Sequence, residues 1–214
     1  MSPSPTQRTY DRLNDAYGFF NAELFAGALP PCLITMQRKN GAYGYFAGDR
    51  FGSKDGQEKT DEIALNPSHF RARTTEEILA TLVHEMAHLW QHHHGKPSRT
   101  SYHNREWAER MRKLGLVPSD TGEPGGKETG QKMHHYAAER GPFALACARL
   151  LAGGFALPYV ELWSDGDEKK RKKKAESKTK YTCPGCGVNA WAKPETRLVC
   201  GDCEVSLEAE EGEA

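Results

Sequence analysis

Apolar side chains recur along much of the chain at the spacing of a helix, in which positions three or four apart share a face. Three segments show this spacing: 10–25, 74–94 and 101–111. In the second segment, Thr74 followed by Glu77 forms a capping box at the start, and Gly95 marks the end. The most apolar segment, 143–157, is too short to span a membrane and predicts a buried helix.

Short apolar runs between these helices predict strands. They lie at 32–37, 44–47 and 62–65. The glycine-rich polar segment 48–61 is expected to separate the last two strands without joining the sheet. A small sheet packed with several helices is typical of an α+β domain, which is the fold class that we predict.

Within the second helix, His84, Glu85 and His88 form an HExxH motif. Residues four apart lie on one face of a helix, so both imidazoles can point at one metal ion with Glu85 beside them. This arrangement leaves coordination positions for a third ligand and a water. The motif therefore predicts a zinc hydrolase in which Glu85 takes a proton from the activated water as general base and returns it to the leaving amine.

The third ligand has several candidates. His94 has the spacing of one zinc protease class, but that class needs a glycine where Gln91 stands, and a continuous helix would turn His94 away. His103 opens the helical pattern of 101–111 and can reach back to the metal. Glu106, one turn later, is the rival, since some zinc enzymes take a glutamate from a downstream helix. The residues favour His103 and leave Glu106 open.

Several segments of the chain resemble those of a known family. Its landmarks are 21–25 followed by Leu29 and Pro30, then 63–67, the HExxH helix, and 102–107. These resemble the SprT-like zinc metalloproteases, which include the Spartan proteases that cut proteins crosslinked to DNA. The resemblance implies a zincin-like catalytic domain with HExxH on the active-site helix and His103 as third ligand. It also implies that an edge strand at 43–46 pairs with the substrate, although ordinary sheet packing explains these residues equally well.

The chain departs from the family pattern at one position. The family usually has a glycine after the third histidine, and here Asn104 stands at that position. Asparagine also tolerates the left-handed backbone conformation that a glycine would serve. The departure therefore leaves the ligand assignment to His103 in place.

Two CxxC pairs near the end of the chain form a second constellation, made of Cys183, Cys186, Cys200 and Cys203. Four thiolates supply a closed tetrahedral zinc site, which has no open position and is therefore structural. A segment this short buries too little apolar surface to fold without the metal. We expect a zinc ribbon, with a redox CxxC as the competing interpretation. Bacterial members of the SprT-like family are similar in carrying such a ribbon.

Changes in composition set the predicted domain boundaries. We expect a catalytic domain over 6–163 with a glycine- and proline-rich loop or insertion at 118–141, a charged flexible linker over 164–180, the ribbon over 181–207, and an acidic disordered tail over 208–214. The insertion contains His134, His135 and Tyr136, which could return to the metal site and stabilise an oxyanion, or only pack or face solvent. The run 92–94 is three histidines, for which a solvated helix end is favoured over metal binding.

Charge and composition add the cellular context. The 214 residues carry a formal net charge of zero, so the overall charge predicts no partner. Residues 1–8 lack an apolar core, which predicts neither a signal peptide nor a membrane anchor, and we expect a cytoplasmic protein. In that reducing compartment Cys32 and Cys147 are expected to be buried free thiols.

DNA is a candidate partner of the C-terminal part. The lysine-rich run 169–174 can contact phosphates, and Trp191, Lys193 and Arg197 offer an aromatic and basic surface. The acidic tail would repel phosphates.

Together these features predict a zinc-dependent endopeptidase with one catalytic and one structural zinc ion, acting on a protein or peptide substrate. The alternative is a non-proteolytic nucleic-acid or transcription-complex binding protein that uses the ribbon and the basic linker. Glu85 favours the enzyme, because a purely structural site has no need of a carboxylate beside an open coordination position. The sequence leaves the physiological substrate, the DNA dependence of activity and the oligomeric state open.

Overall fold

The computed structural model describes residues 2–162 and 178–210, which fall into two compact units, Met1–Glu161 and Leu162–Ala214. The lysine run 169–174 and most of the expected linker lie outside the described residues, as do the last four residues of the expected tail. Helices and sheets are mixed in the first unit, so its fold class is α+β as predicted.

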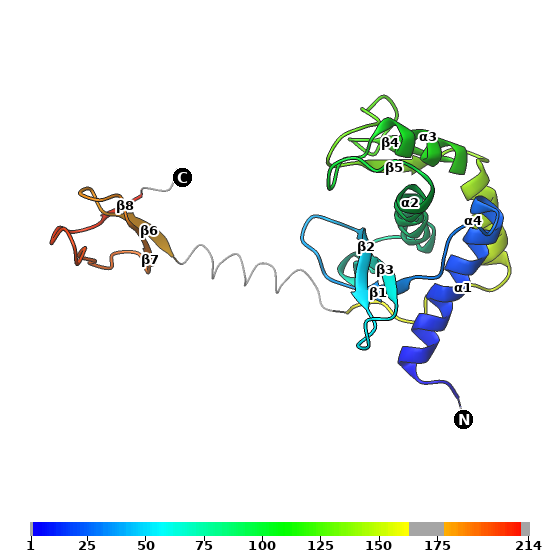
Figure 1. Cartoon of the computed structure of the whole chain (residues 1–214), viewed down its shortest axis with the longest axis horizontal. Coiled ribbons are helices and arrows are strands. Elements are labelled where there is room, and N and C mark those ends of the chain that lie inside the picture. The colour runs from blue at the N-terminus through cyan, green and yellow to red at the C-terminus, as the bar shows by residue number, and fades with distance from the viewer. Residues whose placement is uncertain (1, 163–177, 211–214) are drawn as a thin grey trace. The chain divides into compact units, whose positions relative to one another are not determined.

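Two helices pack together on one side of the first unit (Figure 1). Helix α1 (Pro5–Phe25) is capped by the Ser4 hydroxyl and begins earlier than the predicted 10–25. Helix α4 (Pro142–Ala152) stacks Phe143 on Phe20 of α1, with ring centroids 5.7 Å apart. The predicted helix 143–157 was too long at its C-terminal end, because the chain turns at Gly153 and Gly154, where φ reaches +84° at the second glycine.

The first unit contains a three-stranded sheet with the order β1-β3-β2, formed by β1 (Leu33–Met36), β2 (Gly44–Gly52) and β3 (Lys59–Leu65). Strand β1 is parallel to β3, and β2 is antiparallel to it at an edge of the sheet. The expectation that 48–61 stays outside the sheet was wrong at both ends, because β2 and β3 continue into it as a paired ribbon. A register shift between Ala47 and Phe51 interrupts that ribbon.

Helix α2 (Thr75–His94) lies between this sheet and the layer that contains α3 (Figure 1). Its predicted capping box is present, with the Thr74 hydroxyl accepting from the Glu77 N–H and the Glu77 carboxylate accepting from the Thr74 N–H. Most of its side chains are buried in the core, as expected for a helix covered on both sides.

Helix α3 (Arg105–Leu114) begins two residues after His103, so the expectation that His103 opens this helix was wrong. The Asn104 side chain caps the helix by accepting from the Trp107 N–H, and its φ of −86° is not left-handed. The departure from glycine at this position therefore provides a helix cap.

The segment 118–141, which was expected to be a loop or insertion, includes parts of two strands. Strand β4 (Leu116–Ser119) pairs antiparallel with β5 (His134–Ala137) as a separate two-stranded sheet. Only 120–133 connects the two strands outside regular structure, apart from a bridge between Gly130 and His103. The pairing returns His134 and His135 toward the middle of the unit.

The second unit is a three-stranded sheet with the order β7-β6-β8, made of β6 (Thr179–Thr182), β7 (Asn189–Ala192) and β8 (Glu208–Ala209). The predicted boundaries need correction at both ends. Residues 179 and 180, expected in the linker, open β6, and residues 208 and 209, expected in a disordered tail, pair with it. The buried side chains of this unit are few and include Tyr181, Cys183 and Cys200.

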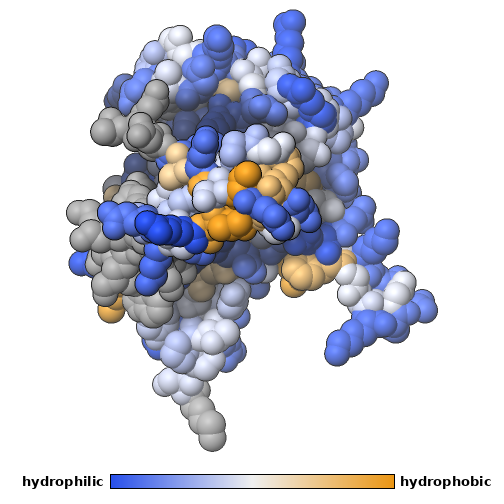
Figure 2. Space-filling model, turned by 90° about the vertical axis from the view of Figure 1, so that its left-hand side faces the viewer, coloured by the Kyte–Doolittle hydropathy of each residue, from blue (hydrophilic) through white to orange (hydrophobic). Residues whose placement is uncertain are grey.

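The visible face of the molecule in Figure 2 is mostly hydrophilic, with small groups of hydrophobic residues. Among the described residues, no helix combines the length and the apolar character needed to cross a membrane.

Candidate metal centre and active site

Three histidines from two places in the sequence converge in the first unit. His84 and His88 lie one turn apart on α2, and His103 reaches them from the segment just before α3. One ring nitrogen of each lies within 4.8 Å of one ring nitrogen of each of the others. The centroids of the three rings are 4.8–5.4 Å apart, so the rings are close enough to bind one metal ion.

Trp107 of α3 is fully buried and supports all three rings. Its ring stacks on His88, with centroids 5.1 Å apart and an interplanar angle of 17°. It meets His84 and His103 nearly edge-on, at 4.9 and 4.4 Å. The indole therefore fixes the rotamers of the cluster from one side.

In two of the three histidines, one ring nitrogen has a partner that orients the ring. His103 Nδ1 lies 3.1 Å from the carbonyl oxygen of Gly130, and His84 Nδ1 lies 3.1 Å from Nδ1 of His135. In each case Nε2 remains available for a metal, and an outer hydrogen bond of this kind accompanies most metal-bound histidines. This geometry fits a bound transition-metal ion.

Burial keeps the three imidazoles neutral. It lowers the pKa of His84 well below the ordinary value and lowers the pKa of His88 to about 3, with neighbouring imidazoles adding to the effect. Burial also lowers the pKa of His103. A neutral imidazole is the form that ligates a metal, so the cluster meets this requirement at neutral pH.

Glu85 is buried beside the cluster, and only 5% of its surface is exposed. Burial raises its pKa to about 8, against the opposing effects of Lys39 and of a hydrogen bond from the Phe46 N–H. Strand β2 approaches closely here. A Cβ atom at Gly44 would lie 2.8 Å from the Ala64 carbonyl oxygen and 3.2 Å from Glu85 Oε1, so only glycine fits without a shift.

The structure places the two rival ligands elsewhere. The Glu106 carboxylate accepts from Gln91 Nε2 and from the Lys96 N–H, both at 2.7 Å. His94 Nε2 lies 3.0 Å from the carbonyl oxygen of Ala28. His103 is therefore the residue that the fold brings to His84 and His88.

The residues of this cluster lie in a range that matches a known protein family. A model of the SprT-like family matches residues 13–125, a range that holds all three histidines and Glu85. This chain belongs to the SprT-like family. A relative from Salmonella typhimurium, described as an uncharacterized protein in the mucB 3' region, is 51% identical over 59 residues, which is 28% of this chain and 80% of the relative. The match to the family model ends at residue 125, before His135 and the four C-terminal cysteines.

A cleft of ≈ 990 Å³ opens over the histidines of this SprT-like domain. One wall is the edge strand β2, and another is formed by His134 and His135 of β5. Arg73 lies over the ring of Tyr43 at 4.1 Å and also faces the cleft. The sequence did not point to Arg73 or to the Gly130 carbonyl, and it placed Gly44 in the expected edge strand without revealing its contact with Glu85. Nothing local to these residues marks them as neighbours of the motif.

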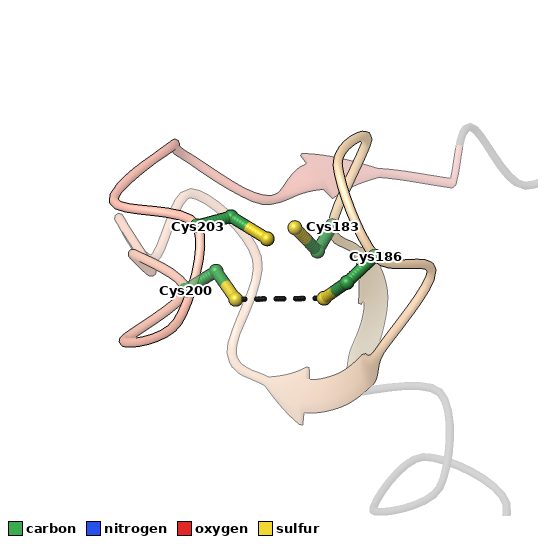
Figure 3. A group of neighbouring side chains, drawn as sticks. All are labelled: Cys183, Cys186, Cys200 and Cys203. Carbon is green, nitrogen blue, oxygen red and sulfur yellow. Dashed lines mark hydrogen bonds between the residues drawn. The ribbon is translucent and has the colours of Figure 1, made fainter.

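The four C-terminal cysteines lie together in the second unit, with their sulfur atoms turned toward one another (Figure 3). None forms a disulfide, and Cys186 Sγ is 3.6 Å from Cys200 Sγ. Hydrogen bonds from the backbone N–H groups of Cys186 and Gly185 lower the pKa of Cys183. Four thiols aimed at one point, one of which has backbone donors that favour its thiolate, fit a metal ion held by sulfur.

Proposed function

We propose that this SprT-like protein is a zinc-dependent endopeptidase with a zincin-like catalytic domain. The observation that carries the proposal is the convergence of His84, His88 and His103 beside a buried carboxylate, Glu85, in a cleft open to solvent. Three ligands and an open position are the pattern of catalytic zinc, whereas structural zinc takes four protein ligands. The association of the SprT-like family with metalloprotease-type domains supports the same conclusion.

When bound by the three histidines, zinc supplies Lewis acidity that activates water and polarises the scissile carbonyl. Glu85 is the group that moves the proton, because it is the carboxylate next to the cluster. A nearby cation favours the charged form of Glu85 and so opposes the effect of its burial. Glu85 accepts the proton from water and then donates it to the leaving amine.

Around this centre, the chain's own residues hold the histidines in place. The Gly130 carbonyl orients His103, and His135 orients His84 through its Nδ1 atom. Among the possible roles for His135, we therefore assign positioning of a ligand, and not stabilisation of an oxyanion.

An extended peptide is the substrate that the cleft suits best. Strand β2 forms one wall and lies at an edge of the sheet, so one side of its backbone is free of sheet partners. A peptide that adds to such an edge gains main-chain hydrogen bonds without regard to its side chains. We assign this docking role to the Gly44–Ala47 part of β2, next to Glu85.

For the C-terminal unit we propose a zinc ribbon with a structural zinc ion held by Cys183, Cys186, Cys200 and Cys203. Its small core supports the proposal, because so few buried residues cannot stabilise the unit without a metal. Trp191 is 61% exposed on β7, and Lys193 and Arg197 are exposed nearby in the sequence. An exposed indole with basic residues is a stacking surface for single-stranded nucleic acid, which makes DNA our proposed partner.

The competing function is nucleic-acid binding without proteolysis. A direct test is incubation of the zinc-loaded full chain with unfolded casein, with and without single-stranded DNA. We expect casein fragments that disappear when zinc is chelated and return when zinc is restored. Intact casein in every zinc-loaded sample, together with DNA binding, would favour the competing function.

A further inference from the structure

A third cluster of metal-ligating side chains lies at the C-terminal end of α2, apart from the three histidines and the four cysteines. Asp61 of β3 meets His92 and His93, and one ligand atom from each lies within 4.8 Å of the others. His93 Nε2 is 2.6 Å from Asp61 Oδ2, and His92 Nε2 is 3.9 Å from Asp61 Oδ1. Each imidazole therefore points its Nε2 atom at the Asp61 carboxylate.

A hydrogen bond explains only half of this arrangement. At 2.6 Å, His93 and Asp61 form a short hydrogen bond, but His92 is beyond hydrogen-bond distance and still faces the carboxylate. Ligand atoms around a tetrahedral zinc ion lie about 3.3 Å apart, given metal–ligand distances of about 2.0 Å. His93 Nε2 is closer than this to one carboxylate oxygen of Asp61, and His92 Nε2 is farther than this from the other oxygen. Rotations of the three side chains would therefore be needed to place a metal between them.

The surrounding backbone is shaped to hold the cluster. At Gly48 a Cβ atom would lie 2.7 Å from Cε1 of His92, so the glycine leaves room for the imidazole. That ring also packs against Phe46, with centroids 5.6 Å apart. Asp49, in the register shift of β2, has a φ of +49° and donates its N–H to Asp61 Oδ1 at 2.8 Å.

The charge state of Asp61 suits a cation. The residue is 5% exposed. Burial alone would raise its pKa, but hydrogen bonds from His93 and from the Asp49 N–H outweigh that effect and lower the pKa below its ordinary value. A buried carboxylate that stays ionised beside two imidazoles is a donor set that zinc accepts.

We propose that Asp61, His92 and His93 form an additional binding site for a divalent transition-metal ion, with zinc as the ion that we would test. The bound ion would join the end of α2 to β3, and through Asp49 it would brace the bulged part of β2. It would take the place of the hydrogen bond between His93 Nε2 and the Asp61 carboxylate. With three protein ligands, this site binds zinc more weakly than the four-cysteine site.

The test measures zinc bound by the untagged full chain in equilibrium dialysis over a range of free zinc concentrations. The comparison uses His92→Gln, Asp61→Asn and, as a matched control, His94→Gln. His92→Gln leaves the hydrogen bond between Asp61 and His93 intact, so it should fold even if Asp61→Asn does not. His94 belongs to the same histidine run, but its Nε2 faces Ala28.

We expect the wild type and His94→Gln to bind one more zinc ion per chain at saturation than His92→Gln and Asp61→Asn. This difference does not depend on how many ions the catalytic centre and the cysteines hold, so it stands apart from the proposed peptidase activity. Equal binding by the wild type and His92→Gln at every zinc concentration would overturn the proposal. Loss of the same ion from His94→Gln would also overturn it, because the run would then bind zinc without Asp61.

Discussion

Replacing Gly44 with alanine tests whether the close approach of β2 to α2 sets the position of Glu85. A Cβ atom at this position would lie 2.8 Å from the Ala64 carbonyl oxygen, 3.0 Å from Thr81 Cγ2 and 3.2 Å from Glu85 Oε1. The first of these is backbone of the neighbouring strand and cannot rotate away. The added methyl group must therefore displace β2, the Glu85 side chain, or both.

The size of the effect follows from this crowding. One extra methyl group in a tightly packed site costs about 1–3 kcal/mol of folding free energy. Gly52→Ala is the matched control on the same strand, because its Cβ atom would meet only the Glu58 carbonyl oxygen, at an ordinary contact of 3.6 Å. A change at such a site is within about 0.5 kcal/mol of the wild type.

Urea denaturation of both variants measures the free energy of unfolding, and metal analysis with casein cleavage reports on the site. We expect Gly44→Ala to be less stable than Gly52→Ala, to keep its zinc, and to cleave casein more slowly. If Gly44→Ala matches the control in stability and in cleavage rate, the close approach of β2 does not position Glu85.

Three further predictions concern the cap of α2, the support of His84 and the C-terminal unit. A hydrogen bond from the Thr74 N–H lowers the pKa of Glu77 below its ordinary 4.5, so the stability that Glu77 contributes is present above pH 4.5 and is lost as the pH falls through the lower pKa of the folded state. The difference in unfolding free energy between the wild type and Glu77→Ala should therefore shrink as the pH is lowered, and a constant difference would contradict the capping role. His135→Ala should weaken zinc binding at the histidine cluster about 10- to 100-fold in chelator competition, whereas the exposed His134→Ala should not. Cys186→Ser should remove one zinc ion and the NMR signals of folded β6 and β7 while casein cleavage remains, and loss of cleavage as well would show that the two units depend on each other.

Local signals in the sequence predicted the centre of the fold well. The capping box at Thr74, the apolar spacing and Gly95 defined both ends of α2, and four-residue spacing placed His84 and His88 on one face. Each of these features acts within one or two helical turns, so it can be recognised without knowledge of the tertiary structure. The helical pattern of α3 was also recognised, although the predicted segment began at residue 101, four residues before the helix.

Contacts between distant segments could not be predicted in this way. Strand β5 and the bulged end of β2 are largely polar and are held by backbone pairing. Their sequences therefore lack the alternation of hydrophobic and polar residues that would predict a strand. The sequence allowed His135 to return to the metal site, but without knowledge of β5 it could not identify the contact of His135 with His84. Asp61, which contacts His92 and His93 of α2, lies on β3 and had no local signal either.

The most direct test of the proposed activity compares Glu85→Gln with the wild type at equal zinc content. Glutamine keeps the shape of the side chain but cannot accept the proton from water, and general-base catalysis contributes about 100-fold or more to rate. Glu106→Gln is the matched control, since Glu106 is a carboxylate of the same unit that lies outside the histidine cluster. We expect Glu85→Gln to bind as much zinc as the wild type and to lose casein cleavage by about 100-fold or more, with Glu106→Gln still active. Cleavage by zinc-loaded Glu85→Gln at the wild-type rate would contradict the proposed mechanism.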